Sequence, residues 1–216
     1  MAILCKCPEG PAIADIPISE CPESFGQIQK VAFQRIFKTG STKNQFDATT
    51  EDPKLLASWT PLLAAADGTK VVQSPYISAP TTEPGAAREY GGGNETVGGI
   101  PIIIGREPTS FSGNILRTNQ GTIAAMKSLE CENVGVFLID EHGNIGLLVD
   151  NRETPKFYSP IPIQGLFIGD KALGGMEAPD MNSISWKFLP NWSDNLVMLS
   201  PSDFNALTDL ATPVTP

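Results

Sequence analysis

The sequence predicts a mainly β fold, an antiparallel β-sandwich or small barrel, with one flanking α-helix and a few short helices. Several short segments alternate apolar and polar side chains with a period of two. Turn formers are frequent, with 20 Gly and 19 Pro among 216 residues, and the 41% of hydrophobic residues is enough for a core. We expect one domain over residues 27–210, between an extended N-terminal arm, 1–26, and a flexible tail, 211–216.

The first regular segment, 27–38, fits a strand and a helix almost equally well by periodicity. Its aromatic and β-branched residues favour a strand. Later segments predict strands by their alternation or by their position beside turn residues, and 157–168 could also be a broken pair. The clearest hairpin joins 134–140 to 145–149 through a turn at 141–144. The predicted strands after the first are 69–73, 100–104, 109–116, 134–140, 145–149, 157–168, 183–189 and 195–199.

Three segments predict helices. Asp52-Pro53 has the order of a helix cap and a first helical residue, and it precedes leucines at helical spacing up to Ala66. Pro61 interrupts that spacing, so a kinked helix or two short helices are expected there. Thr118 or Asn119 is expected to cap the flanking helix, which ends near Leu129. A Ser-Pro pair at 200–201 starts a last short helix over 204–210.

Residues 74–99 contain many Pro and Gly and are predicted to be a long loop. A loop of more than about 15 residues in a compact domain usually has a function of its own, and this one could reach another subunit. Trp192 lies in a predicted turn and is the best candidate among the tryptophans for an exposed contact with a subunit or a ligand. The predicted subunit-contact residues are Tyr90, Gly92, Asn94, Glu95, His142 and Trp192.

Sequence motifs of catalysis are weak. The only histidine, His142, lies in a predicted hairpin turn, which argues against histidine-rich metal sites and histidine-based catalytic triads. Gly93 and Gly98 have the spacing of a phosphate loop, but the Lys-Ser/Thr pair that should follow is missing. Acidic pairs such as Asp140-Glu141 cannot be placed across a substrate from sequence. We therefore predict a protein that is not an enzyme and has no cofactor, metal or catalytic residues.

The charge balance is acidic, with 24 Asp and Glu against 15 Lys and Arg, a net charge of −9. Binding to nucleic acid needs basic surface that replaces counterions, so specific DNA binding is not expected. An acidic surface also favours solubility in general.

The first residues lack the features of a signal peptide, and no apolar run approaches the ~20 residues of a membrane span. We expect synthesis in the cytoplasm, no membrane partner and reduced thiols. A Cys-x-Cys pair with two scattered partners fits a zinc site poorly. The four cysteines are Cys5, Cys7, Cys21 and Cys131.

Three parts of the chain resemble virion structural proteins of tailed bacteriophages, most of all major tail tube proteins. The first is 21–35, Cys-Pro-Glu-Ser-Phe-Gly-Gln-Ile-Gln-Lys-Val-Ala-Phe-Gln-Arg. The second is 99–111, Gly-Ile-Pro-Ile-Ile-Ile-Gly-Arg-Glu-Pro-Thr-Ser-Phe. The third is Ile-Ser-Trp-Lys-Phe at 184–188, followed by Asn-Trp-Ser-Asp at 191–194.

The resemblance implies a β-sandwich or barrel with a flanking helix. Six subunits would close a ring around an acidic channel, through which DNA passes without specific binding. Rings would stack through loops and terminal arms, with copies of the same chain and other virion proteins as partners. The location would be the virion, assembled in the host cytoplasm. The N-terminal arm and the 51–66 insertion exceed a minimal tube subunit. A capsid decoration or other head or tail role, or a receptor- or carbohydrate-binding β-sandwich, stays open.

Overall fold

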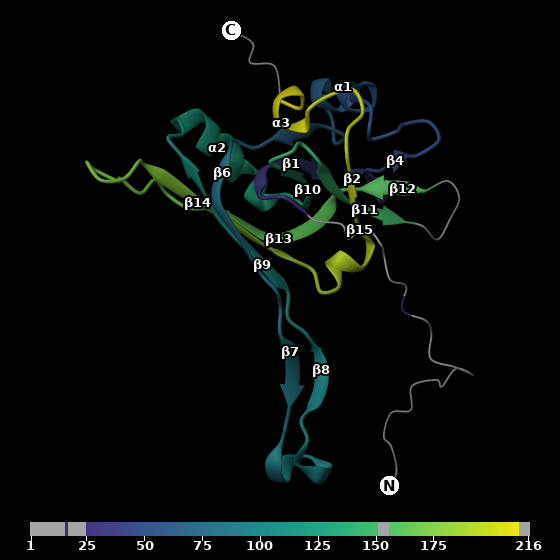
Figure 1. Ribbon diagram of the computed structural model, residues 1–216, viewed down its shortest axis with the longest axis vertical. Coiled ribbons are helices and arrows are strands. Elements are labelled where there is room, and N and C mark those ends of the chain that lie inside the picture. Colours follow the sequence, from purple (N-terminus) through teal and green to yellow (C-terminus); the bar gives the residue numbers. More distant parts are fainter. Residues whose placement is uncertain (1–15, 17–24, 151–155, 212–216) are drawn as a thin grey trace.

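The computed structural model describes Ile16 and residues 25–150 and 156–211, and most of the predicted N-terminal arm and C-terminal tail lies outside them (Figure 1). The fold is mainly antiparallel β, as predicted. The strands are β1 (Ile28–Arg35), β2 (Phe37–Thr39), β3 (Thr42–Lys43), β4 (Phe46–Asp47), β5 (Val71–Gln73), β6 (Ile77–Glu83), β7 (Ala87–Tyr90), β8 (Ile102–Arg106), β9 (Thr109–Leu116), β10 (Val134–Asp140), β11 (Ile145–Asp150), β12 (Phe157–Ser159), β13 (Ile161–Ile168), β14 (Met181–Phe188) and β15 (Leu196–Leu199). The α-helices are α1 (Leu56–Ala64), α2 (Gln120–Ser128) and α3 (Ala206–Asp209).

Strand β10 is the centre of the main sheet. It pairs along its whole length with β1 on one edge. Its other edge is shared, because Gly135 and Val136 pair with β13 whereas Leu138 and Ile139 pair with β11. All seven residues of β10 are buried, so both of its faces are covered. The sheet therefore branches at β10 and wraps around two separate cores.

The first branch encloses the larger core. It runs from β10 through β13, β14 and β9 to β6, and β6 contacts β1, so this branch curls into a barrel-like layer. Alternate residues of β14 point inward, as their sequence pattern predicts: Ile184, Trp186 and Phe188 are at most 1% exposed. The ring of Trp186 stacks on Phe111 of β9 at 3.9 Å between centroids. Met126 of α2 closes part of this core.

The second core lies on the opposite face of β1 and β10. It contains Phe137 from β10 and Trp59 from α1, whose ring centroids are 5.0 Å apart in an edge-to-face arrangement. Phe46 of β4 packs on both rings. Helices α1 and α3 lie on this side of the body (Figure 1), and Leu207 of α3 is buried there. Burial of apolar side chains on both faces of one strand pair joins the two cores into one body.

The three helices are close to their predicted positions, but two of the predicted starts are wrong. Asn119 caps α2 as expected, because its side chain accepts a hydrogen bond from the Thr122 N–H at 2.8 Å. Helix α1 begins at Leu56 rather than at residue 53, and Asp203 accepts the Leu56 N–H at 2.9 Å. Helix α3 is capped by Asn205 and spans only Ala206–Asp209.

The prediction that residues 74–99 form a long loop is wrong. Strands β6 and β7 and two 3-10 turns occupy most of it. One of the prolines of this stretch is accommodated within a strand by irregular pairing. Pro80 lies within β6, beside Ala79 with φ of 48°, where the register with β9 shifts between Ser78 and Thr81. A local bulge of this kind lets a strand continue past a proline.

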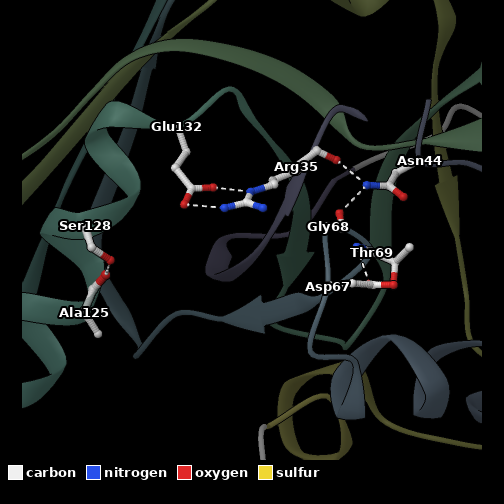
Figure 2. Close-up of polar contacts among 8 residues, drawn as sticks. All are labelled: Arg35, Asn44, Asp67, Gly68, Thr69, Ala125, Ser128 and Glu132. Carbon is white, nitrogen blue, oxygen red and sulfur yellow. Dashed lines mark hydrogen bonds and ion pairs between the residues drawn. The ribbon is translucent and has the colours of Figure 1, made fainter. Parts of the chain in front are cut away.

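A polar cluster fixes the end of β1 (Figure 2). Arg35 forms a two-pronged ion pair with Glu132, in which Nη2 and Oε1 are 2.7 Å apart. The buried Asn44 side chain donates to the carbonyl oxygens of Arg35 and Gly68, each at 2.8 Å. The hydrogen bonds that Glu132 accepts from Arg35 lower the pKa of the Glu132 carboxyl below its usual value. The cluster therefore connects β1 to the segment before β10 and to the loop before β5.

The second core predicts a large difference between two Phe-to-Ala substitutions. Phe137 is fully buried, whereas Phe167 of β13 is 57% exposed. We expect Phe137→Ala to lower the free energy of unfolding by about 3–5 kcal/mol, through lost burial and a residual cavity. Phe167→Ala should change it by about 0.5 kcal/mol or less. Urea unfolding followed by tryptophan fluorescence measures both, and equal effects would contradict the two-core description.

The Arg35–Glu132 pair predicts a pH dependence. A carboxyl whose pKa is lowered in the folded state stabilises the fold above its unfolded pKa of about 4.3. That stabilisation is lost as the pH falls through the lower, folded pKa. Thermal unfolding should therefore show a Tm difference between wild type and Glu132→Gln at pH 7 that shrinks at pH 3. A difference that stays constant or grows on acidification would show that the ion pair is not its source.

Candidate assembly surface

The most prominent surface feature is a long hairpin that extends away from the body (Figure 1). We call residues 84–107 the projecting hairpin. Its root continues from β6 and β9 and is closed by a hydrogen bond from the Glu107 N–H to the Ala86 carbonyl at 2.9 Å. Beyond this point β7 and β8 form a separate two-stranded sheet, with a register shift between Arg88 and Glu89.

The hairpin exposes large apolar side chains. Tyr90 is 60% exposed, and Ile102, Ile103 and Ile104 are 53%, 66% and 65% exposed. Tyr90 pairs with Ile102 and Glu89 with Ile103, and side chains of successive strand residues point to opposite faces. Both faces of this ribbon therefore carry exposed isoleucine. A two-stranded ribbon without a core beneath it is marginally stable in water, so burial against a partner would stabilise it.

Four of the predicted contact residues lie on this hairpin. Tyr90 ends β7, and Gly92, Asn94 and Glu95 follow in the tip, where a 3-10 turn over Gly93–Glu95 is closed by the Glu95 N–H and the Gly92 carbonyl at 3.1 Å. Gly92 has φ of 126°, a conformation that glycine adopts without the strain of a Cβ. Glu95 is the only charged residue between 90 and 104.

His142 lies elsewhere. It is exposed in the β10–β11 turn, which packs against Asn205 before α3, across the body from the hairpin tip (Figure 1). The turn is ordered by the buried Asp140 carboxylate, which accepts the backbone N–H groups of His142 and Asn144 at 2.9 and 2.8 Å. It also accepts the Gly26 N–H at 3.3 Å. Asp140 therefore has a structural role, which is to hold the turn in its conformation.

Trp192 is half-buried, contrary to the prediction of an exposed contact. It lies in a 3-10 turn over Trp192–Asn195, and its ring stacks on Phe188 with centroids 4.3 Å apart. One ring face is therefore used by the body. The other atoms of Trp192 line an apolar depression together with Leu196 and Pro80. The structure thus separates the six predicted residues into a hairpin group, a turn with His142, and Trp192.

The isoleucines of the hairpin and a second exposed apolar tip were missed by the sequence predictions. Leu173 and Met176, between β13 and β14, are 79% and 105% exposed. A signal for the hairpin did exist, because Ile102–Ile104 is a run without alternation beside glycines. Such a run fits a strand buried on both faces, and the sequence could not tell that the described residues leave this strand uncovered.

The described part of the chain contains neither a cluster of metal-ligating side chains nor a membrane-spanning helix. Within residues 25–150 and 156–211, no group of three or more His, Cys, Asp or Glu side chains is placed to hold a metal ion. Cys131 is exposed and unpaired, and the other three cysteines lie outside the described residues. No helix in these ranges is long and apolar enough to cross a membrane.

Comparisons with known proteins return structures of phage-like particles. No family model and no curated protein matches the chain. The tail of an empty gene transfer agent particle, refined with C6 symmetry, is similar at 15% identity and a TM-score of 0.32, over 57% of this chain and 81% of that chain. The virion of the native gene transfer agent particle is similar at 14% identity and a TM-score of 0.32, over 57% of this chain and 84% of that chain. The sixfold-symmetrised baseplate of the anti-feeding prophage is similar at 12% identity and a TM-score of 0.32, over 85% of this chain and 99% of that chain.

Proposed function

We propose that this chain is a structural subunit of a phage-like tail, and specifically a tube subunit that forms stacked hexameric rings around a DNA channel. The observation that carries the proposal is the projecting hairpin, with exposed isoleucine on both faces. Exposed apolar surface of this kind on a soluble subunit is typical of an interface. The sequence resemblance to major tail tube proteins supports the ring number and the partners, which are copies of the same chain and other virion proteins.

The backbone of the hairpin offers a second mode of contact. In the two-stranded sheet β7–β8, each strand pairs with the other along one edge only. The free edges carry N–H and C=O groups that can pair with a strand of another subunit. Pairing of this kind, combined with burial of Ile102 and Ile103 on opposite faces, would let one hairpin contact two neighbours. Repeated around a ring, these contacts would close the assembly.

The channel surface is assigned to the outer face of β9 and β14. The only charged residue in these two strands is Lys187. Ser112 lies opposite Ser185, and Asn114 opposite Ser183, so small uncharged side chains form a continuous patch. Phosphates are held by groups of basic side chains, and this face has one. The patch and the net charge of −9 support a channel that DNA crosses without specific binding, although the patch itself is neutral rather than acidic.

Deletion of the hairpin tests the proposal. Replacing residues 88–105 by Asn-Gly joins Ala87 to Arg106 through a two-residue turn and keeps the hydrogen bond between Ala86 and Glu107. We expect the wild type to form rings or tubes in negative-stain images. The deletion variant should be monomeric by sedimentation velocity, with a thermal unfolding midpoint close to that of wild type.

The same images supply the contradicting outcomes. A wild type that stays monomeric at every concentration would refute a self-assembling subunit. A deletion variant that assembles as well as wild type would show that the contacts lie elsewhere. A substitution at the exposed Glu89, Glu89→Thr, is the matched control, because it changes the hairpin without removing apolar surface, and it should assemble normally.

A further inference from the structure

An apolar groove of about 320 Å³ opens on the body at the root of the projecting hairpin. Its apolar lining comes from four separate parts of the chain: Phe25 and Ile28 before and in β1, Pro80 in β6, Leu138 in β10, and Trp192 and Leu196 after β14. Among the described residues no charged side chain lines it, although 18% of the chain is charged. We call this depression the root groove.

The root groove is built on rigid elements. Its floor is Leu138 of the central strand β10, which is 2% exposed. One wall is Trp192, held by stacking on Phe188. Phe25 packs closely on Gly146, where an added Cβ would lie 2.5 Å from the ring. A groove whose walls are fixed by the core is already shaped for an apolar ligand, so little ordering cost opposes binding.

We infer that the root groove receives the apolar tip of the projecting hairpin from a second copy of the chain. The inference rests on the proposed function and adds the site at which the hairpin binds. The tip is the matching surface, because residues 90–104 include only one charged residue and expose Ile100 at 71% and Val97 at 86%. The hairpin extends away from its own body (Figure 1), so its tip lies far from its own groove and needs another molecule.

This contact joins two different surfaces of the same chain. Each copy offers one tip and one groove, so every bound copy leaves a tip free at one end and a groove free at the other. A heterologous contact of this type propagates, and closes a ring or extends a filament according to its rotation. Tip-in-groove contact is therefore sufficient to produce an open-ended assembly from identical subunits.

A pair of complementary variants tests the inference. Thr82 and Gln27 are exposed at the mouth of the root groove, so Thr82→Arg or Gln27→Arg blocks it with a charge while leaving the core intact. The 88–105 deletion removes the tip and keeps the groove. Thr42→Arg, at an exposed position in β3, is the matched control for the added charge.

Sedimentation velocity on full-length proteins gives the readout. We expect each groove variant to need at least a tenfold higher concentration than wild type to assemble, while Thr42→Arg assembles like wild type. At a concentration at which wild type assembles but the groove variants do not, the deletion variant and either groove variant should each be monomeric alone. An equimolar mixture of the two should form a 1:1 dimer and nothing larger, because it holds one usable tip and one usable groove.

Each other outcome overturns the inference in a recognisable way. If the groove variants assemble like wild type while the deletion variant is monomeric, the tip binds elsewhere and the proposed function survives. If the mixture stays monomeric, hairpins contact one another or a different surface. If wild type never assembles, the inference and the proposed function both fail.

Discussion

Burial of β10 on both faces is the constraint on which the rest of this structure depends. A strand with seven buried residues needs a cover on each of its faces. The chain meets this requirement by dividing the edge of β10 between β13 and β11. One branch curls back toward β1 around Trp186, and the other, through β11, packs Ile145 and Leu147 into the second core with Phe137 of β10. Loss of either cover would expose half of β10 to water.

The same constraint explains why the projecting hairpin is left without a core. Strands β6 and β9 pack on the first core along the body, where Ile77 and Ile115 are buried. Between Glu83 and Thr109 the chain continues outward, and no other helix or strand of the described residues lies beneath it (Figure 1). Ile103 is therefore exposed to solvent, although isoleucine is typical of a protein interior. In the proposed tail structure, other subunits would bury this exposed apolar surface.

Sequence patterns predicted the regular parts of the body well. Alternation placed Ile184 and Trp186 in the core, and of the two alternatives for 157–168, one strand or a broken pair, the structure has the pair β12 and β13. Asn119 was one of two residues predicted to cap α2, and it does so. The six candidate contacts stay predictions: four of them share one hairpin, and Trp192 is half-buried rather than exposed because Phe188 stacks on it. Ring stacking between residues of different elements leaves no mark in local periodicity.

By itself, the sequence determined the fold class, most strands and the acidic, non-basic character of the chain. These depend on side-chain alternation, turn residues and charge, which act over a few residues or over the whole chain. Only the tertiary structure decided which strands share an edge, that 74–99 contains strands, and where α1 begins. That start depends on Asp203, 147 residues away from Leu56 in sequence. Contacts across such separations form only when the whole chain folds, so no local pattern encodes them.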